Sequence, residues 1–352
     1  AMPVRHGTAS PGRRMRPAGP FLALALVPLI ADAAHALAAT APRASLAASL
    51  RVRDDLRTAS SPAGVGACLR RHGQAANRVN QCDAMVRLGR MADLPGARDQ
   101  ATTVMDAIAA GGHAALTPRQ AANVIWAQSR LGLRRDVDAL LDAALSPAAP
   151  VRISPPELCM TLYALSCLSH LPPPRAAAAL DAAVVELSPR LRNRNVALSL
   201  YALAVAPAPP EGSPSAADSR LAAALALAAE ASARTRAMRV TDLSMAAWGL
   251  ATFATTHDWR AEEAGVALLR AAEGALAGRH GHMAGRDAAQ LLVACARLRH
   301  DEGRLVDLLA AKLLQLLPRG ELGDADVVNA LWGLARLGLC AAGWGGGAAG
   351  PG

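Results

Sequence analysis

Aromatic residues are scarce in this 352-residue chain and make up only 3% of it, as five Trp, two Tyr and two Phe. Because β-sandwiches and β-barrels draw heavily on aromatic and β-branched residues, this scarcity argues against an all-β fold. The chain is instead rich in Ala and Leu, which lose little conformational freedom in a helix. Hydrophobic residues reach 52%, enough for a sizeable core, which excludes global disorder. The composition therefore predicts an all-α protein.

Lysine is almost absent, since Lys312 is the only one and Arg supplies the other basic residues. The formal net charge is +9, but residues 1–53 hold seven Arg and one Asp, which together carry +6. Residues 54–352 therefore carry only +3. A strongly basic domain would predict a polyanionic partner. Here most of the excess charge belongs to the N-terminal segment, so net charge alone does not predict such a partner for the rest.

Acidic residues are missing from the N-terminal segment, where the first is Asp32. Three Arg within residues 13–16 precede an apolar run at 21–31, an order that resembles a signal peptide. Residues 40–57 are rich in Ala, Ser and Arg and resemble a transit segment. We interpret residues 1–57 as a two-part targeting leader of the complex-plastid kind, removed on maturation, with a mitochondrial presequence as the alternative. No other segment is apolar for 18 residues, so we expect no membrane contact by the mature form.

Motifs for catalysis and for cofactor binding are also missing. The chain has no phosphate-binding Gly-Lys-Ser/Thr loop, no G-x-G-x-x-G after a predicted strand and no G-x-S-x-G. Its six cysteines form no C-x-x-C pair. His280, His282 and His300 have no carboxylate or Cys at metal-ligand spacing, so we interpret them as ordinary loop residues. The sequence predicts no catalytic residue, no cofactor, no metal and no small-molecule substrate.

An internal repeat is the strongest positive feature. The segment Thr117–Gly132 matches Asp326–Gly338 in Asn, Trp, Arg, Leu and Gly at equal spacing. Further copies place an aromatic residue, or its equivalent, at one fixed position. These ring positions are Asp83, Trp126, Tyr163, Tyr201, Trp248, Val293 and Trp332, and successive ones are 37 to 47 residues apart. Copies of this length are typical of stacked two-helix repeats.

Each copy divides into two predicted helices. The first carries the ring position and begins at a capping signal such as Thr117–Pro118 or Ser154–Pro155. The second helices are predicted at 136–145, 175–187, 220–231, 261–276 and 304–317. Because one pair cannot bury its apolar face alone, the copies must stack.

We therefore expect a right-handed α-solenoid, or superhelix, of about seven two-helix repeats of roughly 40 residues over residues 75–340. Residues 341–352 are rich in Gly. They are either a flexible tail or a truncated end. Truncation is favoured because the last helix would need a cap.

The motif Thr-Pro-x-x-Ala-Ala-Asn-Val-Ile-Trp-Ala-x-x-Arg-Leu-Gly at 117–132 resembles the octotricopeptide repeat of algal organelle proteins. It is also similar to the helical repeats of FAST-kinase-like proteins and of kinetoplastid RNA-editing substrate-binding complex proteins. The resemblance covers roughly residues 75–340. It implies binding of single-stranded organelle RNA in transcript stabilisation, processing, editing or translation, in the plastid stroma or the mitochondrion. RNA-processing or ribonucleoprotein complex proteins are implied as further partners.

The family resemblance leaves alternatives to simple RNA binding open. Many of these proteins carry a C-terminal RAP domain with a nuclease-like fold, and this chain ends before one. We therefore expect a non-catalytic RNA-binding protein. The alternatives are an armadillo-like scaffold of an organelle ribonucleoprotein complex and the binding half of a RAP-domain-type nuclease.

Two positions flanking the ring are candidate RNA contacts, three residues before it and four after it. They lie seven residues apart and so share one helix face. The predicted RNA-binding residues are Asn80, Asn123, Gln290 and Asn329 at the first position and Arg87, Arg130, Arg297 and Arg336 at the second. Amides can bond base edges, and Arg can hold phosphate or stack on a base. A structural role stays open for both, since Arg also suits a helix C-terminus and Asn could fix the repeat spacing.

The ring column itself consists of Trp126, Tyr163, Tyr201, Trp248 and Trp332. Its neighbours along each helix are mostly apolar, as at Ile125, Leu162 and Leu200. We therefore expect a structural column whose rings fill the space between the two helices of each copy, and not a platform for bases.

Overall fold

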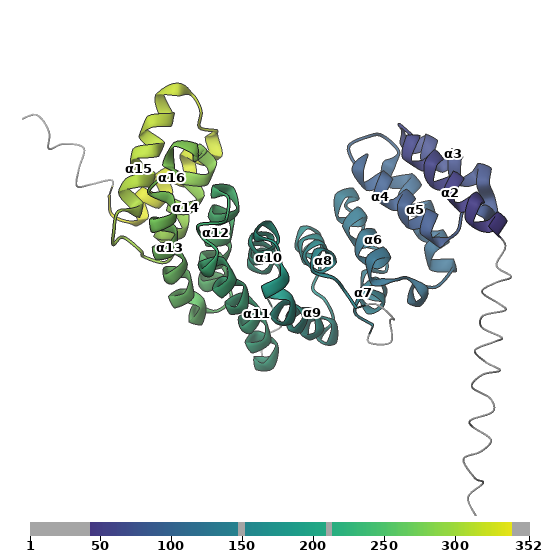
Figure 1. Ribbon diagram of the computed structural model, residues 1–352, viewed down its shortest axis with the longest axis horizontal. Helices are drawn as coiled ribbons and strands as arrows, with labels where there is room; N and C mark the ends of the chain where they lie inside the picture. The colour runs from purple at the N-terminus through teal and green to yellow at the C-terminus, as the bar shows by residue number, and fades with distance from the viewer. Residues whose placement is uncertain (1–42, 147–151, 209–212, 340–352) are drawn as a thin grey trace, which may run out of the picture. The chain divides into compact units, whose positions relative to one another are not determined.

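The structure is a computed structural model that describes residues 43–146, 152–208 and 213–339 (Figure 1). All regular structure in these residues is helical, as the composition predicted. The chain divides into two units at residues 51 and 52. The described part of the first unit is the helical stretch 43–51. The second unit holds the packed helices considered below.

The ring positions of the repeat each lie in a separate helix, and we call these the A helices. They are α4 (Arg78–Arg90), α6 (Pro118–Leu131), α8 (Pro155–Leu168), α10 (Asn193–Val205), α12 (Val240–Thr256), α14 (Gly285–Arg297) and α16 (Asp324–Arg336). Both predicted capping signals are confirmed. The Thr117 hydroxyl accepts from the backbone N–H of Gln120, and the Glu157 carboxylate accepts from that of Ser154 at 2.8 Å. Each pair satisfies donors that the first turn would leave free.

The second helices of the copies, which we call the B helices, confirm the predicted segments to within a few residues. They are α5 (Ala97–Ala110), α7 (Val137–Leu145), α9 (Pro174–Leu187), α11 (Pro214–Ala233), α13 (Glu262–Leu276) and α15 (Leu305–Leu316). The largest difference is at α11, which begins at Pro214 instead of Arg220. The helix α5 was not among the predicted segments.

The helices pack in chain order, as expected for an α-solenoid. Each A helix from α4 to α14 contacts the next A helix, and the B helices from α7 to α15 contact one another in the same order. The result is two rows of helices around one shared core. Superhelix handedness and the count of seven repeats stay predictions. No described helix has the length and apolar character needed to cross a membrane.

A small residue directly follows each ring position and lets successive A helices touch. It is Ala in α4, α6, α8, α10 and α14 and Gly in α12 and α16. A Cβ placed on Gly249 would lie 2.8 Å from the Tyr201 backbone nitrogen and 2.9 Å from the Leu200 carbonyl carbon. The backbones of α10 and α12 are therefore in direct contact. Gly333 is more tolerant, because the nearest atom there is the Leu292 Cγ at 2.9 Å.

Two helices precede the first predicted copy, α2 (Arg43–Thr58) and α3 (Pro62–His72). Val52 and Leu56 of α2 are fully buried and belong to the same core as the repeats. The packed unit thus begins well before residue 75. The predicted leader, 1–57, ends inside α2, and its role stays a prediction because residues 1–42 lie outside the described residues. The same holds for the Gly-rich segment 341–352.

A buried ion pair joins two neighbouring B helices. Arg220 of α11 donates from Nε to both carboxylate oxygens of Asp181 in α9, at 3.1 and 3.4 Å. The two side chains are only 7% and 3% exposed. Burial raises the pKa of Asp181 to about 6, although the Arg220 charge opposes the rise. The Nη1 of Arg220 has no partner within the described residues, so this pair is incompletely compensated.

Candidate nucleic-acid interface

Three rings of the predicted column form a continuous row along the A helices. The ring centroids of Tyr163 and Tyr201 are 6.5 Å apart, and those of Tyr201 and Trp248 are 5.4 Å apart and stacked. The guanidinium of Arg297 lies 5.4 Å from the centroid of Trp248. All four side chains are partly exposed. We call Tyr163, Tyr201, Trp248 and Arg297 the ring ladder.

The rings lie between successive A helices, which corrects the expectation that they fill the space between the A and B helices. The ladder joins α8, α10, α12 and α14. The interior is filled instead by the residues just before the rings, such as Ile125 and Leu200, which are fully buried. One residue further along a helix turns a side chain by about 100°, which brings the rings to the border between core and solvent.

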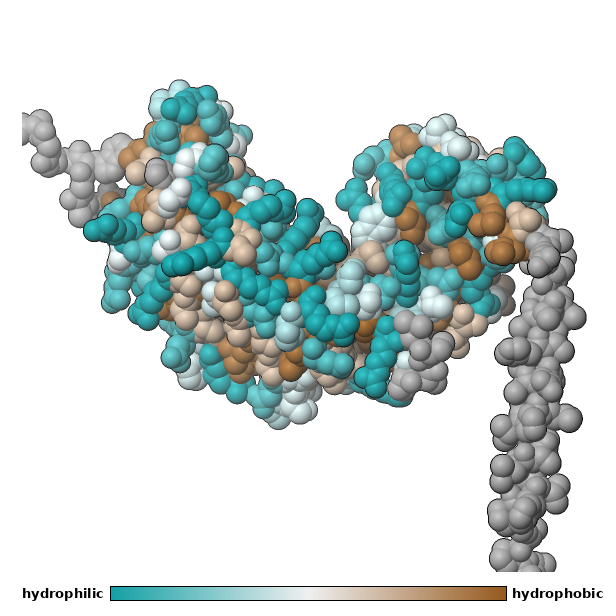
Figure 2. Space-filling view, in the orientation of Figure 1, coloured by the Kyte–Doolittle hydropathy of each residue, from teal (hydrophilic) through white to brown (hydrophobic). Residues whose placement is uncertain are grey.

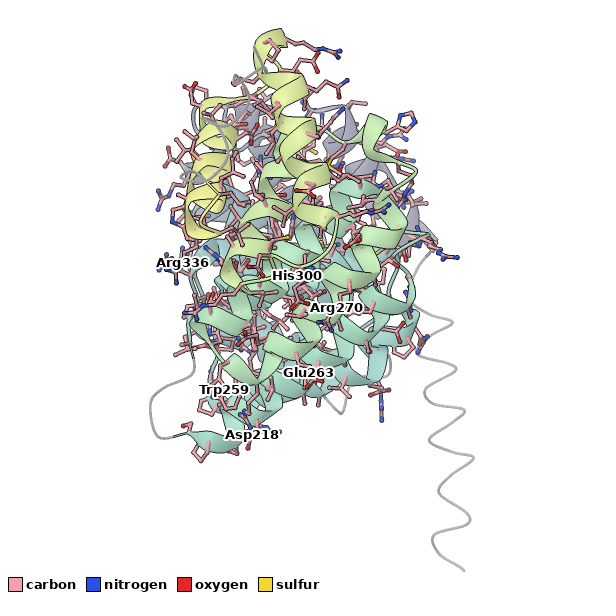
Figure 3. All side chains as sticks on the ribbon, turned by 90° about the vertical axis from the view of Figure 1, so that its left-hand side faces the viewer. Asp218, Trp259, Glu263, Arg270, His300 and Arg336 are labelled. Carbon is pink, nitrogen blue, oxygen red and sulfur yellow. The ribbon has the colours of Figure 1, made fainter. Side chains whose placement is uncertain are left out.

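The arginine column divides into two kinds of residue. Arg87 donates from Nε and Nη2 to the Ala59 carbonyl at 3.0 and 2.7 Å, and Arg297 donates to the Thr252 hydroxyl. These two therefore hold parts of the protein together. Arg130 and Arg336 are exposed, and Figure 3 shows Arg336 at the outer surface of the unit. Only the second kind presents its full charge to solvent.

The amide column is less uniform than predicted. Asn80 is 1% exposed, and its side-chain oxygen accepts from the Asn77 N–H at 3.2 Å while Asn77 caps Asn80 in return. Asn80 is thus a capping residue and not an exposed RNA contact, because α4 begins only two residues before it. Asn123 and Gln290 are half-buried, and Asn329 is exposed. The Gln290 oxygen lies 3.5 Å from the Ser244 hydroxyl of the preceding A helix.

A groove of about 230 Å³ with four arginines lies at the start of the A-helix row. Four basic side chains line it, namely Arg53 and Arg57 of α2 and Arg87 and Arg90 of α4. We call this pocket the basic groove. Asp83, the ring position of the first copy, is the acidic residue among them, and burial raises its pKa. Four arginines and one aspartate line the groove, so it is net positive and suits a phosphate, although Arg87 also holds the Ala59 carbonyl. The groove was not predicted from the sequence, because Arg53 and Arg57 fell in the predicted leader.

A second cluster that sequence reasoning missed lies between α2 and α3. Side-chain atoms of Asp55, Cys68 and His72 all lie within 4.8 Å of one another. The sequence carried one signal, the four-residue spacing of Cys68 and His72, but Asp55 belonged to the predicted leader. Of the three histidines considered in the sequence, His282 is exposed and His300 is buried, and neither belongs to a metal-ligand cluster of the described residues. The His280 side chain lies outside the described residues.

One strongly exposed ring of the described residues stands outside the column. Trp259, in the short helix Trp259–Ala261, is 75% exposed. The neighbouring Arg260 forms an ion pair with Asp218 at 2.8 Å, and Figure 3 shows Trp259 and Asp218 at the same edge of the unit. Cys167 is also exposed, although it lies in an apolar stretch of α8. Hydrogen bonding to the Cys167 side chain raises the pKa of Tyr163.

No family model matches the chain, and no curated protein matches it.

Proposed function

We propose that the second unit binds single-stranded RNA along its A helices, without catalysis of its own, and acts in organelle RNA metabolism. The observation that carries the proposal is the ring ladder, which presents partly exposed aromatic side chains with a guanidinium at one end. Proteins that hold single-stranded nucleic acid combine aromatic side chains with a positively charged track. The repeat resemblance at residues 117–132 supports the same class of ligand.

The basic groove supplies the phosphate contacts in this proposal. The groove is lined by Asp83, which is the ring position of the first copy, and by Val86, Arg87 and Arg90 on the same helix. The groove therefore continues the row of ring positions. A strand that follows this row meets the four arginines first, then exposed Arg130, and then the ring ladder. Arginine forks hold phosphate oxygens at two points, which fixes the strand without reading its sequence. The tyrosine hydroxyls and Asn123 then face the sugars and bases.

The central test compares two triple variants of equal charge. The first triple variant removes three exposed arginines from the proposed track and keeps Arg87 on the Ala59 carbonyl. Its substitutions are Arg57→Gln, Arg90→Gln and Arg130→Gln. We expect RNA affinity to fall by about tenfold or more. We also expect the dependence of log affinity on log salt to flatten by about 0.7 for each lost phosphate contact. Fluorescence anisotropy with a labelled single-stranded RNA at several salt concentrations measures both.

The matched control removes three exposed arginines at or beside the B helices, so its charge changes by the same amount. Its substitutions are Arg175→Gln, Arg190→Gln and Arg270→Gln. It should bind RNA like the wild type. Equal weakening by both triple variants would mean that net charge, and not the track, holds the RNA. Failure of the wild type to bind RNA at low salt would refute the proposed function itself.

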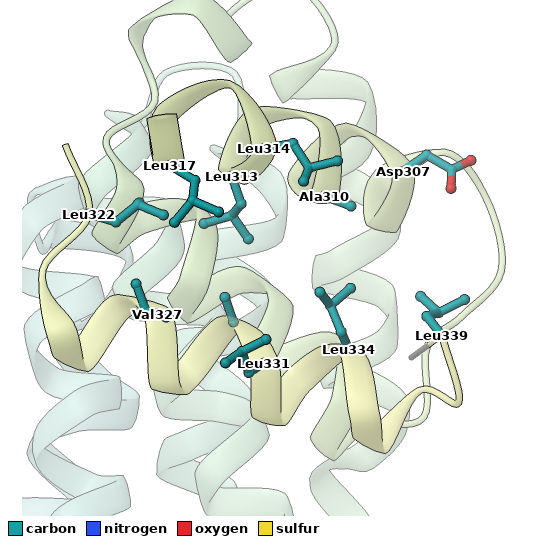
Figure 4. Close-up of a pocket in the computed structure, with 11 residues that line it drawn as sticks. Asp307, Ala310, Leu313, Leu314, Leu317, Leu322, Val327, Leu331, Leu334 and Leu339 are labelled. Atoms are coloured by element: carbon teal, nitrogen blue, oxygen red, sulfur yellow. The ribbon is translucent and has the colours of Figure 1, made fainter. Parts of the chain in front are cut away.

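A protein–protein scaffold is the second candidate, favoured by an apolar groove between α15 and α16 (Figure 4). Leu314, Leu317 and Leu331 line it and are 50% or more exposed. In α6 and α10 the residues equivalent to Leu331, Ile125 and Leu200, are fully buried. Elsewhere on the face seen in Figure 2, hydrophobic residues form small separate patches among hydrophilic ones. A scaffold would lose its protein partners on Leu331→Glu and would not bind RNA.

A further inference from the structure

We infer that Asp55, Cys68 and His72 form a zinc-binding site that links α2 to α3. The three side chains offer one carboxylate oxygen, one thiol sulfur and one imidazole nitrogen within 4.8 Å of one another. This is the combination of donors that Zn²⁺ favours, whereas Mg²⁺ and Ca²⁺ need several oxygen ligands. None of the three residues lines the basic groove or belongs to the ring ladder.

The backbone places these donors in a way that suits one ion. Cys68 and His72 are four residues apart on α3 and therefore lie one above the other on the same face. Asp55 reaches them from α2, where its Oδ2 is 2.8 Å from the His72 Nε2. In a tetrahedral zinc site, neighbouring donor atoms are about 3.3–3.7 Å apart. The cluster therefore needs only side-chain adjustments of roughly 1 Å to receive the ion.

The surroundings leave room for exchange of the ion and of its fourth ligand. Cys68 is buried, with its sulfur 3.8 Å from the Val52 carbonyl, while the Asp55 side chain is 45% exposed. The cluster thus has a protected thiol at its base and a solvent-facing carboxylate at its mouth. Arg71 lies 3.8 Å from Asp55 but is itself 71% exposed, so it can turn away. A water molecule would complete three protein ligands.

A second His–Asp pair in the same chain serves as the comparison. The Nε2 of His170 and the Oδ1 of Asp138 are also 2.8 Å apart, with similar exposure. No thiol of the described residues joins that pair in a ligand cluster. If a His–Asp pair alone were enough to bind the ion, the His170–Asp138 pair would bind it as well as the His72–Asp55 pair does. The sulfur of Cys68 is therefore the feature that the test must isolate.

The test titrates the full chain, stripped with a chelator, with Co²⁺ and then displaces it with Zn²⁺. One equivalent of Co²⁺ should give the near-ultraviolet band of a thiolate–cobalt bond, and Zn²⁺ should abolish it. Cys68→Ser should remove this band. His72→Ala should weaken binding by more than about 100-fold, because even residues outside the coordination sphere contribute about 10–100-fold. His170→Ala and Cys159→Ser should bind like the wild type.

A stability measurement separates lost binding from lost folding. Zinc should raise the thermal midpoint of the wild type and leave that of Asp55→Asn unchanged, since an ion that binds only the folded state stabilises it. Asp55 is half-exposed, so Asn should not disturb the packing. Absence of the thiolate band in the wild type would overturn the site. So would unchanged cobalt binding by Cys68→Ser.

Discussion

Replacing Asp181 with Leu should lower the free energy of unfolding by about 3–5 kcal/mol, as is usual when one partner of a buried ion pair is removed. The substitution leaves Arg220 only 7% exposed, with its Nε deprived of both carboxylate oxygens and its Nη1 already without a partner. An arginine cannot discard its charge to escape this environment. Urea denaturation followed by circular dichroism measures the change.

Two control variants make this result specific. Asp181→Leu combined with Arg220→Met replaces both ions by apolar side chains, and we expect it to recover the stability of the wild type or exceed it. Asp106→Ala removes an exposed partner of Arg135, 2.7 Å away, and should change stability by less than about 1 kcal/mol. A wild-type urea midpoint for Asp181→Leu alone would show that Arg220 finds another acceptor.

The same pair predicts a pH effect. The pKa of Asp181 is about 6 in the folded chain and about 3.9 for an unfolded Asp, so the folded state keeps this proton to a higher pH. The contribution of Asp181 to stability is therefore fully present below about pH 4 and is lost as the pH rises to about 6. Wild type and the double apolar variant should differ in this interval, with the wild type losing more stability. Parallel pH profiles would contradict the raised pKa.

Gly249→Ala should destabilise the protein by about 1–3 kcal/mol, although Ala is the better helix former. The new methyl group would lie 2.8 Å from the Tyr201 nitrogen, and a backbone atom cannot turn aside. The helices α10 and α12 must then separate, which also loosens the stacking of Tyr201 on Trp248. The free energy of unfolding in urea measures the loss.

Gly274→Ala is the matched control for this close approach. Gly274 is an exposed residue of α13, and a Cβ there would meet nothing within 4 Å. Ala restricts the unfolded chain more than Gly does, so the free energy of unfolding should stay unchanged or rise by up to about 1 kcal/mol. If both variants lost equal stability, the cause would be the loss of glycine itself and not contact between helices.

The helices were predictable because their signals are local. Helix starts are marked by a hydroxyl residue followed by proline, as at Thr117–Pro118 and Ser154–Pro155. The spacing of the aromatic ring positions located the A helices. Apolar spacing alone located four of the B helices to within one residue at each end and detected α11. Such information lies within a few residues of the position it describes, so a single sequence contains it.

The site was harder to predict because its contacts are not local. Asn80 follows the repeat pattern, yet α4 begins only two residues before it. Asn80 therefore lies in the first turn and forms a capping box with Asn77. The basic groove and the Asp55 cluster each join α2 to a helix that comes later in the chain. The orientation of the rings toward the next A helix depends on Gly or Ala at the following position, a pairing that a helix-by-helix reading misses.

The burial of Val52 and Leu56 has a consequence for the predicted removal of a leader that ends at residue 57. A processing protease needs an extended, accessible backbone, whereas residue 57 lies within α2 and next to a side chain in the core. Cleavage there would have to occur while the chain is still unfolded. It would remove two core side chains, two arginines of the basic groove and Asp55 of the candidate zinc site. After folding, cleavage at this bond would first require α2 to detach from the core.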